Sequence, residues 1–143
     1  MLLKLIVVGR VKDLHYQAKI NEFMQRLNAF GKVEVVELKD DTVEKESAAI
    51  LKQLENERSW VVVLDERGEN ITSAAWAEKI KNCDRKIVLV IGGAFGFTEA
   101  VRKRADYLLA LSKFTVTHEM ARLLLVEQLY RACTIIAGKK YHH

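Results

Sequence analysis

The sequence predicts an α/β domain in which a mostly parallel sheet is flanked by helices. Short apolar runs typical of buried strands alternate with segments whose apolar residues recur at helical spacing. Parallel strands need crossover connections, which helices usually supply. The chain has 143 residues and no proline or low-complexity linker, so we expect a single domain over residues 1–143.

The first apolar run, Leu2 to Val8, is closed by Gly9 and predicts a strand. No small-residue cleavage site follows it, which argues against a signal peptide. Asp13 offers an N-cap for an amphipathic helix that Gly31 terminates. The later elements are expected in this order: a strand from Val33, a helix carrying Ile50, Leu51 and Leu54, strand Trp60–Leu64, loop Asp65–Gly68, a helix capped by Thr72 or Ser73, strand Ile87–Ile91, a short helix from Thr98, strand Tyr107–Leu111, and a long helix His118–Ala137 stopped by Gly138.

Composition excludes several classes of protein. Half of the residues are hydrophobic, enough for a core without metal or disulfides, and Cys83 and Cys133 have no metal-ligand or CxxC spacing. We therefore expect reduced thiols and no metal. No run reaches the ~18 apolar residues of a membrane span, which predicts a cytoplasmic protein without membrane contact. The net charge of +4 is compatible with RNA binding, and a dimer would double it.

Ligands of parallel sheets usually bind beyond the carboxyl ends of the strands, so the loops there are candidate sites. The fourth predicted strand runs into Gly92-Gly93-Ala94-Phe95-Gly96, where the backbone could approach a ligand closely or simply turn into the next helix. This loop matches neither GxGxxG nor GxxxxGK[ST], which disfavours dinucleotide and P-loop binding.

The segment after the fifth predicted strand runs from Ser112 to His118 and could surround a small polar ligand. Thr117 is equally suited to cap the long helix. His118 would stand at the N-terminus of that helix, where the helix dipole favours a neutral imidazole able to act as an acceptor or base.

The long C-terminal helix is apolar almost all round, and a second subunit is the simplest cover for its outer face. We therefore expect a homodimer. Arg122, Glu127 and Arg131 interrupt this apolar surface, and Glu127 and Arg131 are spaced to form a pair. The tail from Lys139 to His143 could contact phosphates and bases, or be a solvated terminus or a trace of a purification tag.

Several motifs, in this order, resemble the small SPOUT enzymes that methylate N3 of a pseudouridine in the large-subunit (23S) rRNA. The similarity runs from end to end. It is carried by the strand ending in Val7-Val8-Gly9, Leu64-Asp65-Glu66-Arg67-Gly68, Ile91-Gly92-Gly93-x-x-Gly96, Ser112-Lys113-x-Thr115, Glu127-Gln128-x-Tyr130-Arg131-Ala132 and Tyr141-His142.

The resemblance implies a C-terminal trefoil knot that forms a pocket for S-adenosylmethionine. The cofactor-binding residues it implies are Leu64, Gly93, Ser112, Lys113, Phe114, Thr115, Val116 and Thr117. Proline usually occupies the position of Thr117 in this family, and losing its fixed φ would loosen the loop and lower cofactor affinity rather than change the cofactor.

The expected reaction is an in-line methyl transfer from a sulfonium to a ring nitrogen, which needs alignment and removal of the N3 proton. As catalytic candidates, His118 or His142 would remove the proton, Arg131 would hold phosphate or the developing anionic base, and Tyr141 would stack on or hydrogen-bond the target. Arg122, Lys139 and Lys140 are the RNA-binding candidates, and Arg122 is also an alternative to Arg131.

Three other functions stay open on the sequence. The chain could be a catalytically silent protein that binds the ribosome or RNA, or a SPOUT methyltransferase that acts on another RNA such as tRNA. A nucleotide-binding regulatory domain is the third, disfavoured by the missing phosphate motifs. Ribosomal RNA, free or in an assembled ribosome, is the expected partner.

Overall fold

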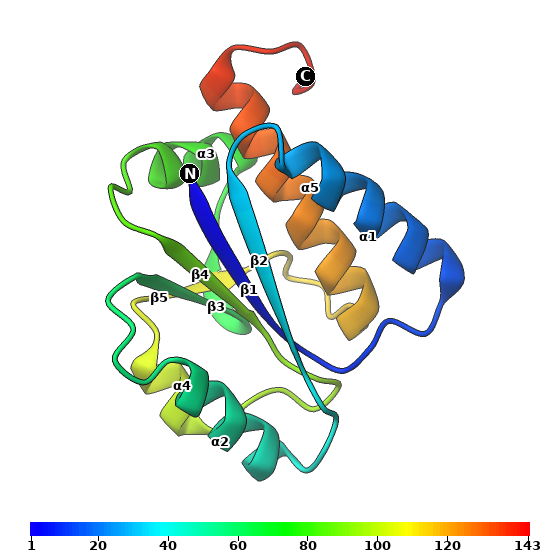
Figure 1. The fold of residues 1–143 in the computed structure, drawn as a ribbon, viewed down its shortest axis with the longest axis vertical. Helices are drawn as coiled ribbons and strands as arrows, with labels where there is room; N and C mark the ends of the chain where they lie inside the picture. Colours follow the sequence, from blue (N-terminus) through cyan, green and yellow to red (C-terminus); the bar gives the residue numbers. More distant parts are fainter.

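A computed structural model describes all residues, 1–143, and has at its centre a parallel five-stranded sheet in the order β2-β1-β4-β3-β5 (Figure 1). The predicted α/β class is confirmed. The elements are β1 (Leu2–Val8), α1 (Leu14–Leu27), β2 (Lys32–Leu38), α2 (Val43–Gln53), β3 (Trp60–Asn70), α3 (Ser73–Lys81), β4 (Ile87–Ile91), α4 (Glu99–Arg104), β5 (Tyr107–Ala110) and α5 (His118–Ala137).

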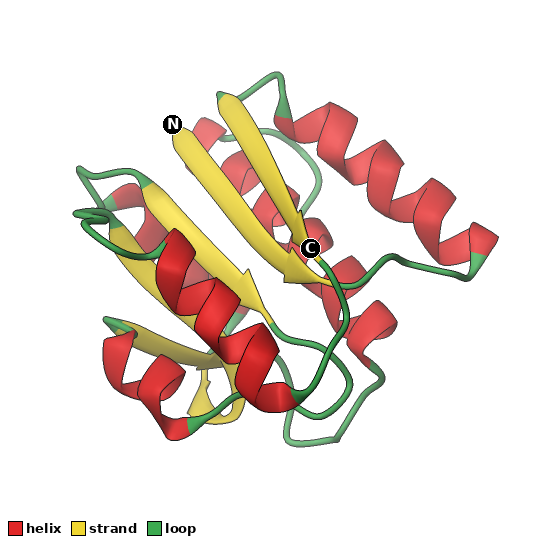
Figure 2. Ribbon diagram, turned by 60° about the horizontal axis from the view of Figure 1, so that its bottom comes forward, coloured by secondary structure: helices red, strands yellow, loops and turns green.

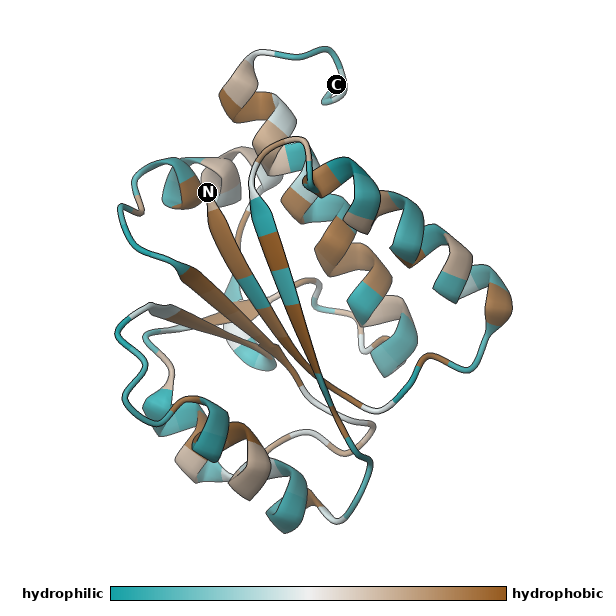
Figure 3. Cartoon of the chain, in the orientation of Figure 1, coloured by the Kyte–Doolittle hydropathy of each residue, from teal (hydrophilic) through white to brown (hydrophobic).

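Helices cover both faces of the sheet. Helices α1, α5 and α3 lie on one face and α2 and α4 on the other (Figure 2). Apolar side chains of the central strands therefore feed two core clusters, the larger under α1, α3 and α5 and the smaller under α2 and α4. Figure 3 shows β1 and β4 as mainly hydrophobic ribbons at the middle of the sheet, as expected for strands buried on both faces.

The capping residues expected from the sequence take their positions. The side chains of Asp13 and Thr72 accept hydrogen bonds from backbone N–H groups of the first turns of α1 and α3. Gly138 ends α5 with φ of +68°, a left-handed conformation that glycine adopts without steric cost.

Strand β3 departs from the prediction, because Asp65–Gly68 is not a loop between elements but part of a strand that continues to Asn70. Leu64 and Glu69 both pair in parallel with Leu109, so they must flank that residue, and the chain between them crosses β5. At the crossing a Cβ on Gly68 would lie 2.6 Å from the carbonyl carbon of Leu108. Backbone thus packs on backbone, and only glycine fits there.

The passage of residues 65–68 across β5 is compatible with a threaded chain in this region. The trefoil knot itself is an expectation from the family resemblance. None of the helices combines the length and the apolar character that a membrane span needs.

Candidate functional site

Residues 64–66 of β3 and the loops that follow β4 and β5 meet at the carboxyl edge of the sheet and enclose a hollow of about 300 Å³. A second hollow of about 130 Å³ adjoins it. The two share Leu64, Asp65, Glu66, Thr115, Val116 and Ala121 as lining residues, so they form one continuous depression. This is the place where a parallel sheet is expected to bind its ligand.

Most of the residues that the resemblance assigns to the cofactor lie around this depression. Leu64, Thr115 and Val116 line both hollows, Gly93 lines the larger one, and Ser112 and Phe114 line the smaller one. Lys113 and Thr117 line neither. Thr117 is instead the N-cap of α5, where its hydroxyl accepts a hydrogen bond from the Met120 N–H at 3.3 Å.

An ion pair that the sequence analysis missed fixes one wall of the larger hollow. Arg102 of α4 donates from Nε to the nearly buried carboxylate of Asp65, and its Nη1 donates to the carbonyl oxygen of Phe97 at 3.1 Å. Because Asp65 follows the third predicted strand and Arg102 lies in a separate helix, only the folded chain brings them together. The pair ties β3 to α4, and the bond to Phe97 ties both to the loop after β4.

A hydrogen bond also joins β3 to the loop after β5. The Thr115 hydroxyl donates to Glu66 Oε2 at 3.3 Å. Within the loop after β5 the Phe114 N–H donates to the Ser112 hydroxyl oxygen at 2.9 Å. The walls of the depression are therefore held before any ligand is bound.

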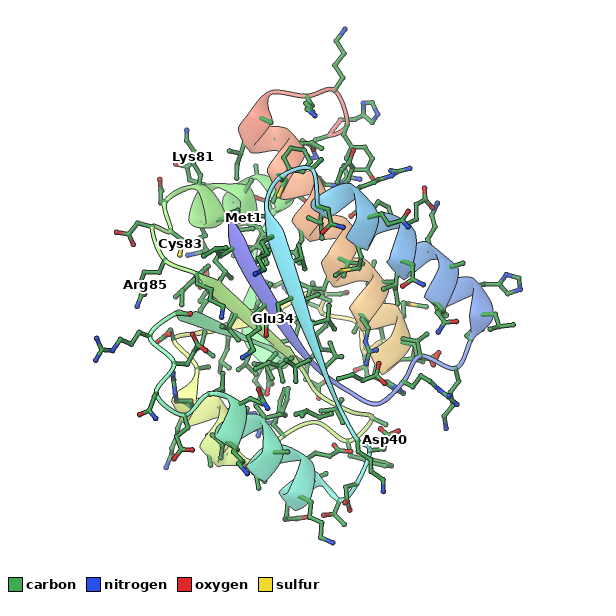
Figure 4. The ribbon with its side chains drawn as sticks, viewed as in Figure 1. Met1, Glu34, Asp40, Lys81, Cys83 and Arg85 are labelled. Carbon is green, nitrogen blue, oxygen red and sulfur yellow. The ribbon has the colours of Figure 1, made fainter.

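Glu46 of α2 supports the glycine loop from behind, another role that the sequence analysis missed. Its carboxylate is 93% buried and accepts a hydrogen bond from the Asp41 N–H at 2.9 Å, in the turn after β2, where Figure 4 shows the neighbouring Asp40. A Cβ on Gly93 would lie 2.9 Å from Glu46 Oε1. Packing against Glu46 thus requires glycine at position 93.

The first turn of α5 places His118 in the lining of the larger hollow. The neighbouring Glu119 accepts hydrogen bonds from the Lys12 and Asp13 N–H groups, each at 3.1 Å, and these backbone donors lower the pKa of its carboxyl group. The start of α5 is therefore anchored to the loop after β1, and His118 is held at the edge of the depression.

Arg122 is not at the surface of the chain, contrary to what RNA contact would need. Its side chain is buried, and Nη2 donates to the carbonyl oxygens of Val8 and Gly9 at 3.1 and 3.0 Å. Burial lowers the pKa of this guanidinium, while the nearby carboxylates of Glu37, Glu119 and Asp40 act in the opposite direction. In this chain Arg122 links α5 to the end of β1.

The other end of α5 carries a second polar cluster. Glu127 Oε1 accepts hydrogen bonds from Arg131 Nη2 at 2.7 Å and from the Tyr141 hydroxyl at 3.0 Å, which confirms the expected Glu127–Arg131 pair. Arg131 Nη1 lies 3.2 Å from His142 Nδ1. The ring of Tyr141 packs edge-on against Tyr130, with centroids 4.8 Å apart. The tail is therefore docked on α5 rather than frayed.

Two groups that donate hydrogen bonds to Glu127 have raised pKa values. The pKa of Tyr141 is raised, first by burial and then by its hydrogen bond to Glu127, so its hydroxyl is a donor at neutral pH. The pKa of Arg131 is raised by the same carboxylate. Lys139 and Lys140 beside the cluster are exposed.

The chain does not bring its predicted catalytic residues together. Residues 118 and 131 are separated along α5 by about 20 Å at the helical rise. Met1, at the amino end of the sheet, has its sulfur 3.8 Å from Cys133 Sγ, so this part of α5 lies at the edge opposite to the depression. His118 borders the depression, whereas the C-terminal end of α5 and the tail that follows it lie at the far end of the molecule (Figure 1).

No group of three or more His, Cys, Asp or Glu side chains is arranged to hold a metal ion. Other hollows lie away from these segments, among them an open one of about 670 Å³ beside α3. The convergence of β3 with the loops after β4 and β5 distinguishes the depression from these.

Comparison with known proteins identifies similar chains over the full length. The family model described as "Predicted SPOUT methyltransferase" matches residues 1–142. Curated relatives named "Ribosomal RNA large subunit methyltransferase H" include those of Anaeromyxobacter sp., 41% identical, and Halothermothrix orenii, 37% identical. In each case 99% of both chains is covered.

Solved structures support the same fold at low identity. A probable methylase family protein from Haemophilus influenzae (TM-score 0.59) and a tRNA (m1G37) methyltransferase from Aquifex aeolicus (TM-score 0.57) are each 16% identical. The alignments cover 99% and 92% of this chain and 70% of each of those chains. The matched family model and the full-length relatives agree with the fold, and the chain belongs to the SPOUT methyltransferase family.

Proposed function

We propose that this protein transfers a methyl group from S-adenosylmethionine to N3 of a pseudouridine in the large-subunit (23S) rRNA. The observation that carries the proposal is the depression at the carboxyl edge of the sheet, bordered by residues that the family uses for its cofactor. Full-length similarity to relatives named as large-subunit rRNA methyltransferases supports the choice of substrate. Such a substrate would be met in the cytoplasm.

The residues of the depression fit S-adenosylmethionine. Leu64, Val116 and Ala121 offer apolar walls for an adenine ring, and Glu66 contributes a carboxylate for the cationic end of the molecule. A related SPOUT-like structure, of AviRb from Streptomyces viridochromogenes, was solved in complex with this cofactor. It has a TM-score of 0.50 and 14% identity over 96% of this chain and 61% of that one. The cofactor supplies an electrophilic methyl group on a sulfonium.

The protein's own part in the reaction is alignment and proton removal. His118 at the edge of the larger hollow is the base that a single chain offers near the cofactor. The Tyr141 hydroxyl keeps its proton at neutral pH, and its raised pKa makes it a still weaker base, so it would orient the target base rather than deprotonate it. Arg131 would stabilise the negative charge that develops on the deprotonated ring, and His142 is the alternative base.

The separation of these groups favours a homodimer in which one subunit's tail completes the other subunit's site. The outer face of α5 is available for such pairing, because Met120 is exposed and Leu124 is only partly covered. Two antiparallel copies of α5 would bring His118 of one chain towards Arg131 of the other. The exposed Lys139 and Lys140 would then lie beside the site and could contact phosphates.

Thermal unfolding with and without S-adenosylmethionine tests the cofactor. A ligand at about 100 times its dissociation constant adds ~2.7 kcal/mol to the stability of the native state. We expect a clear rise in Tm with S-adenosylmethionine and none with ATP. Mass mapping of rRNA after incubation would then locate the methyl group, with tRNA as the alternative substrate. Absence of both the Tm shift and methyl transfer would favour a silent RNA-binding protein.

Single alanine variants test the roles of the catalytic candidates. We expect His118→Ala, Arg131→Ala and His142→Ala to lower turnover while each folded variant retains cofactor binding. Unchanged turnover in any one of them would remove its catalytic role. Mixing His118→Ala with Arg131→Ala chains tests sharing between subunits, because a mixed dimer would regain one complete site.

A further inference from the structure

Two phenylalanines on the loops of the depression are almost fully exposed. Phe95 is 87% and Phe114 is 85% exposed, whereas Met120 and Ile136 on α5 are only 37% and 41% exposed. Phe95 borders the larger hollow and Phe114 the smaller one. Because the two hollows share lining residues and form one depression, both rings lie at the rim of that depression.

Both rings are carried on hydrogen-bonded turns. The Gly96 N–H donates to the carbonyl oxygen of Gly93 at 3.3 Å, and these two glycines form an isolated bridge with Phe95 between them. Phe114 is fixed by the bond from its own N–H to the Ser112 hydroxyl oxygen. The rings are thus presented on backbone that is already ordered, so little entropy would be lost when a partner binds.

We propose that Phe95 and Phe114 are stacking platforms for unpaired RNA bases next to the target nucleotide. The inference rests on the proposed function and specifies that the RNA is recognised as a single-stranded segment. Aromatic side chains bind unpaired bases face to face, and a nucleotide splayed from its neighbours needs such support on both sides. The exposed cations Lys113, next to Phe114 in sequence, and Arg67, next to the lining residue Glu66, would meet the backbone phosphates.

Two other occupants make different predictions. If the rings covered the cofactor, replacing Phe95 would weaken S-adenosylmethionine binding. If a second copy of the chain covered them, the same change would weaken the dimer. For Phe95, which is not among the expected cofactor-binding residues, an RNA platform leaves cofactor affinity and molecular mass unchanged and alters RNA binding alone.

The experiment compares Phe95→Ala, Phe114→Ala and the aromatic replacement Phe95→Trp with the wild type. Leu14→Ala is the matched control, because Leu14 is 76% exposed but lies at the start of α1. Affinity is measured for a short single-stranded RNA and for the same sequence in a duplex. Calorimetry with S-adenosylmethionine and light scattering report the cofactor affinity and the oligomeric state of the Phe95 variants.

Each alanine variant should bind single-stranded RNA at least about five-fold more weakly, as expected for the loss of one stacking contact. Phe95→Trp should restore binding, and duplex binding and the Leu14→Ala variant should not change. Unchanged RNA affinity in Phe95→Ala, or a loss of cofactor affinity or of dimer mass in it, would overturn the inference. A wild type that binds RNA through Phe95 but transfers no methyl group would count against the proposed function alone.

Discussion

Arg122 on α5 and Val8 at the end of β1 are joined by a buried hydrogen bond of 3.1 Å between the guanidinium Nη2 and the carbonyl oxygen. A second bond of 3.0 Å reaches Gly9. The cation has carbonyl oxygens rather than a carboxylate as direct partners, and its Nε is buried without one. These bonds fix the start of α5, which carries His118, relative to the end of β1.

Replacing Arg122 with methionine should therefore destabilise the fold. The change leaves two buried carbonyl oxygens without donors, and we expect the free energy of unfolding to fall by about 2–3 kcal/mol. Urea denaturation measures it. Arg67→Met is the control, since Arg67 is 67% exposed and its pair with Glu99 should contribute less than about 1 kcal/mol. A stable Arg122→Met protein with weakened RNA binding would indicate the surface role expected from the sequence.

Gly68→Ala should be more harmful than a typical surface change. The new methyl group would meet the backbone of Leu108 and Leu109 at 2.6 to 2.8 Å, and no side chain can move away to accommodate it. We expect a loss of at least about 2 kcal/mol in unfolding free energy, together with weaker cofactor binding, because Leu64 precedes the crossing. Gly138→Ala, with open space around it, should cost only about 1 kcal/mol. Equal losses would show that the crossing is not tightly packed.

Glu127→Ala should release the C-terminal tail. The change removes the common acceptor of Arg131 and Tyr141, so trypsin should cleave after Lys139 and Lys140 sooner than in the wild type. We expect turnover to fall while S-adenosylmethionine affinity stays unchanged. Glu22→Ala is the control, because it also removes a carboxylate shared by two cations, on α1. It should change neither the rate of tail cleavage nor turnover.

The two thiols should differ sharply in reactivity. Burial raises the pKa of Cys133 to about 11, so almost no thiolate is present at pH 8. Cys83 lies in the turn between α3 and β4, partly exposed (Figure 4). A thiol reagent should therefore modify Cys83 alone in the native protein. Cys83→Ser should react only on unfolding, and fast labelling of that variant at pH 8 would contradict the burial of Cys133.

The raised pKa of Cys133 also predicts how the free energy of unfolding depends on pH. The folded state favours the neutral thiol, so this contribution to stability is complete below pH 9, the ordinary value, and is lost as the pH rises towards 11. Unfolding free energy measured across that range should fall more steeply in the wild type than in Cys133→Ala.

The alternation of strands and helices was predictable because each element carries its own hydrophobic period and cap. Asp13, Thr72 and Thr117 cap the helices that the sequence assigned to them. The position of His118 at the edge of the loop after β5 was predictable in the same way, because the N-cap Thr117 marks where that loop ends and α5 begins.

What could not be predicted depends on contacts between distant residues. The crossing of β5 requires Gly68 to meet residues 108 and 109, and a glycine in a polar segment looks like an ordinary turn until that contact is known. Arg122 is charged and lies on a helix, so sequence alone assigns it to the surface. Its burial depends on two carbonyl oxygens more than a hundred positions earlier. His118 and Arg131 were both predicted to be catalytic from their chemistry, but they lie 13 residues apart on one helix, and the rise of that helix keeps them apart within a single chain.

One wall of the depression, formed by the loop at residues 112–117 and the adjoining His118, comes from the last quarter of the chain. During synthesis the earlier strands emerge first, and N-terminal segments begin to fold before the rest is made. The cofactor pocket is consequently assembled near the end of translation. A product that stops before residue 112 would retain β1 to β5, yet it would lack both that wall and the base, so premature termination should yield no partially active enzyme.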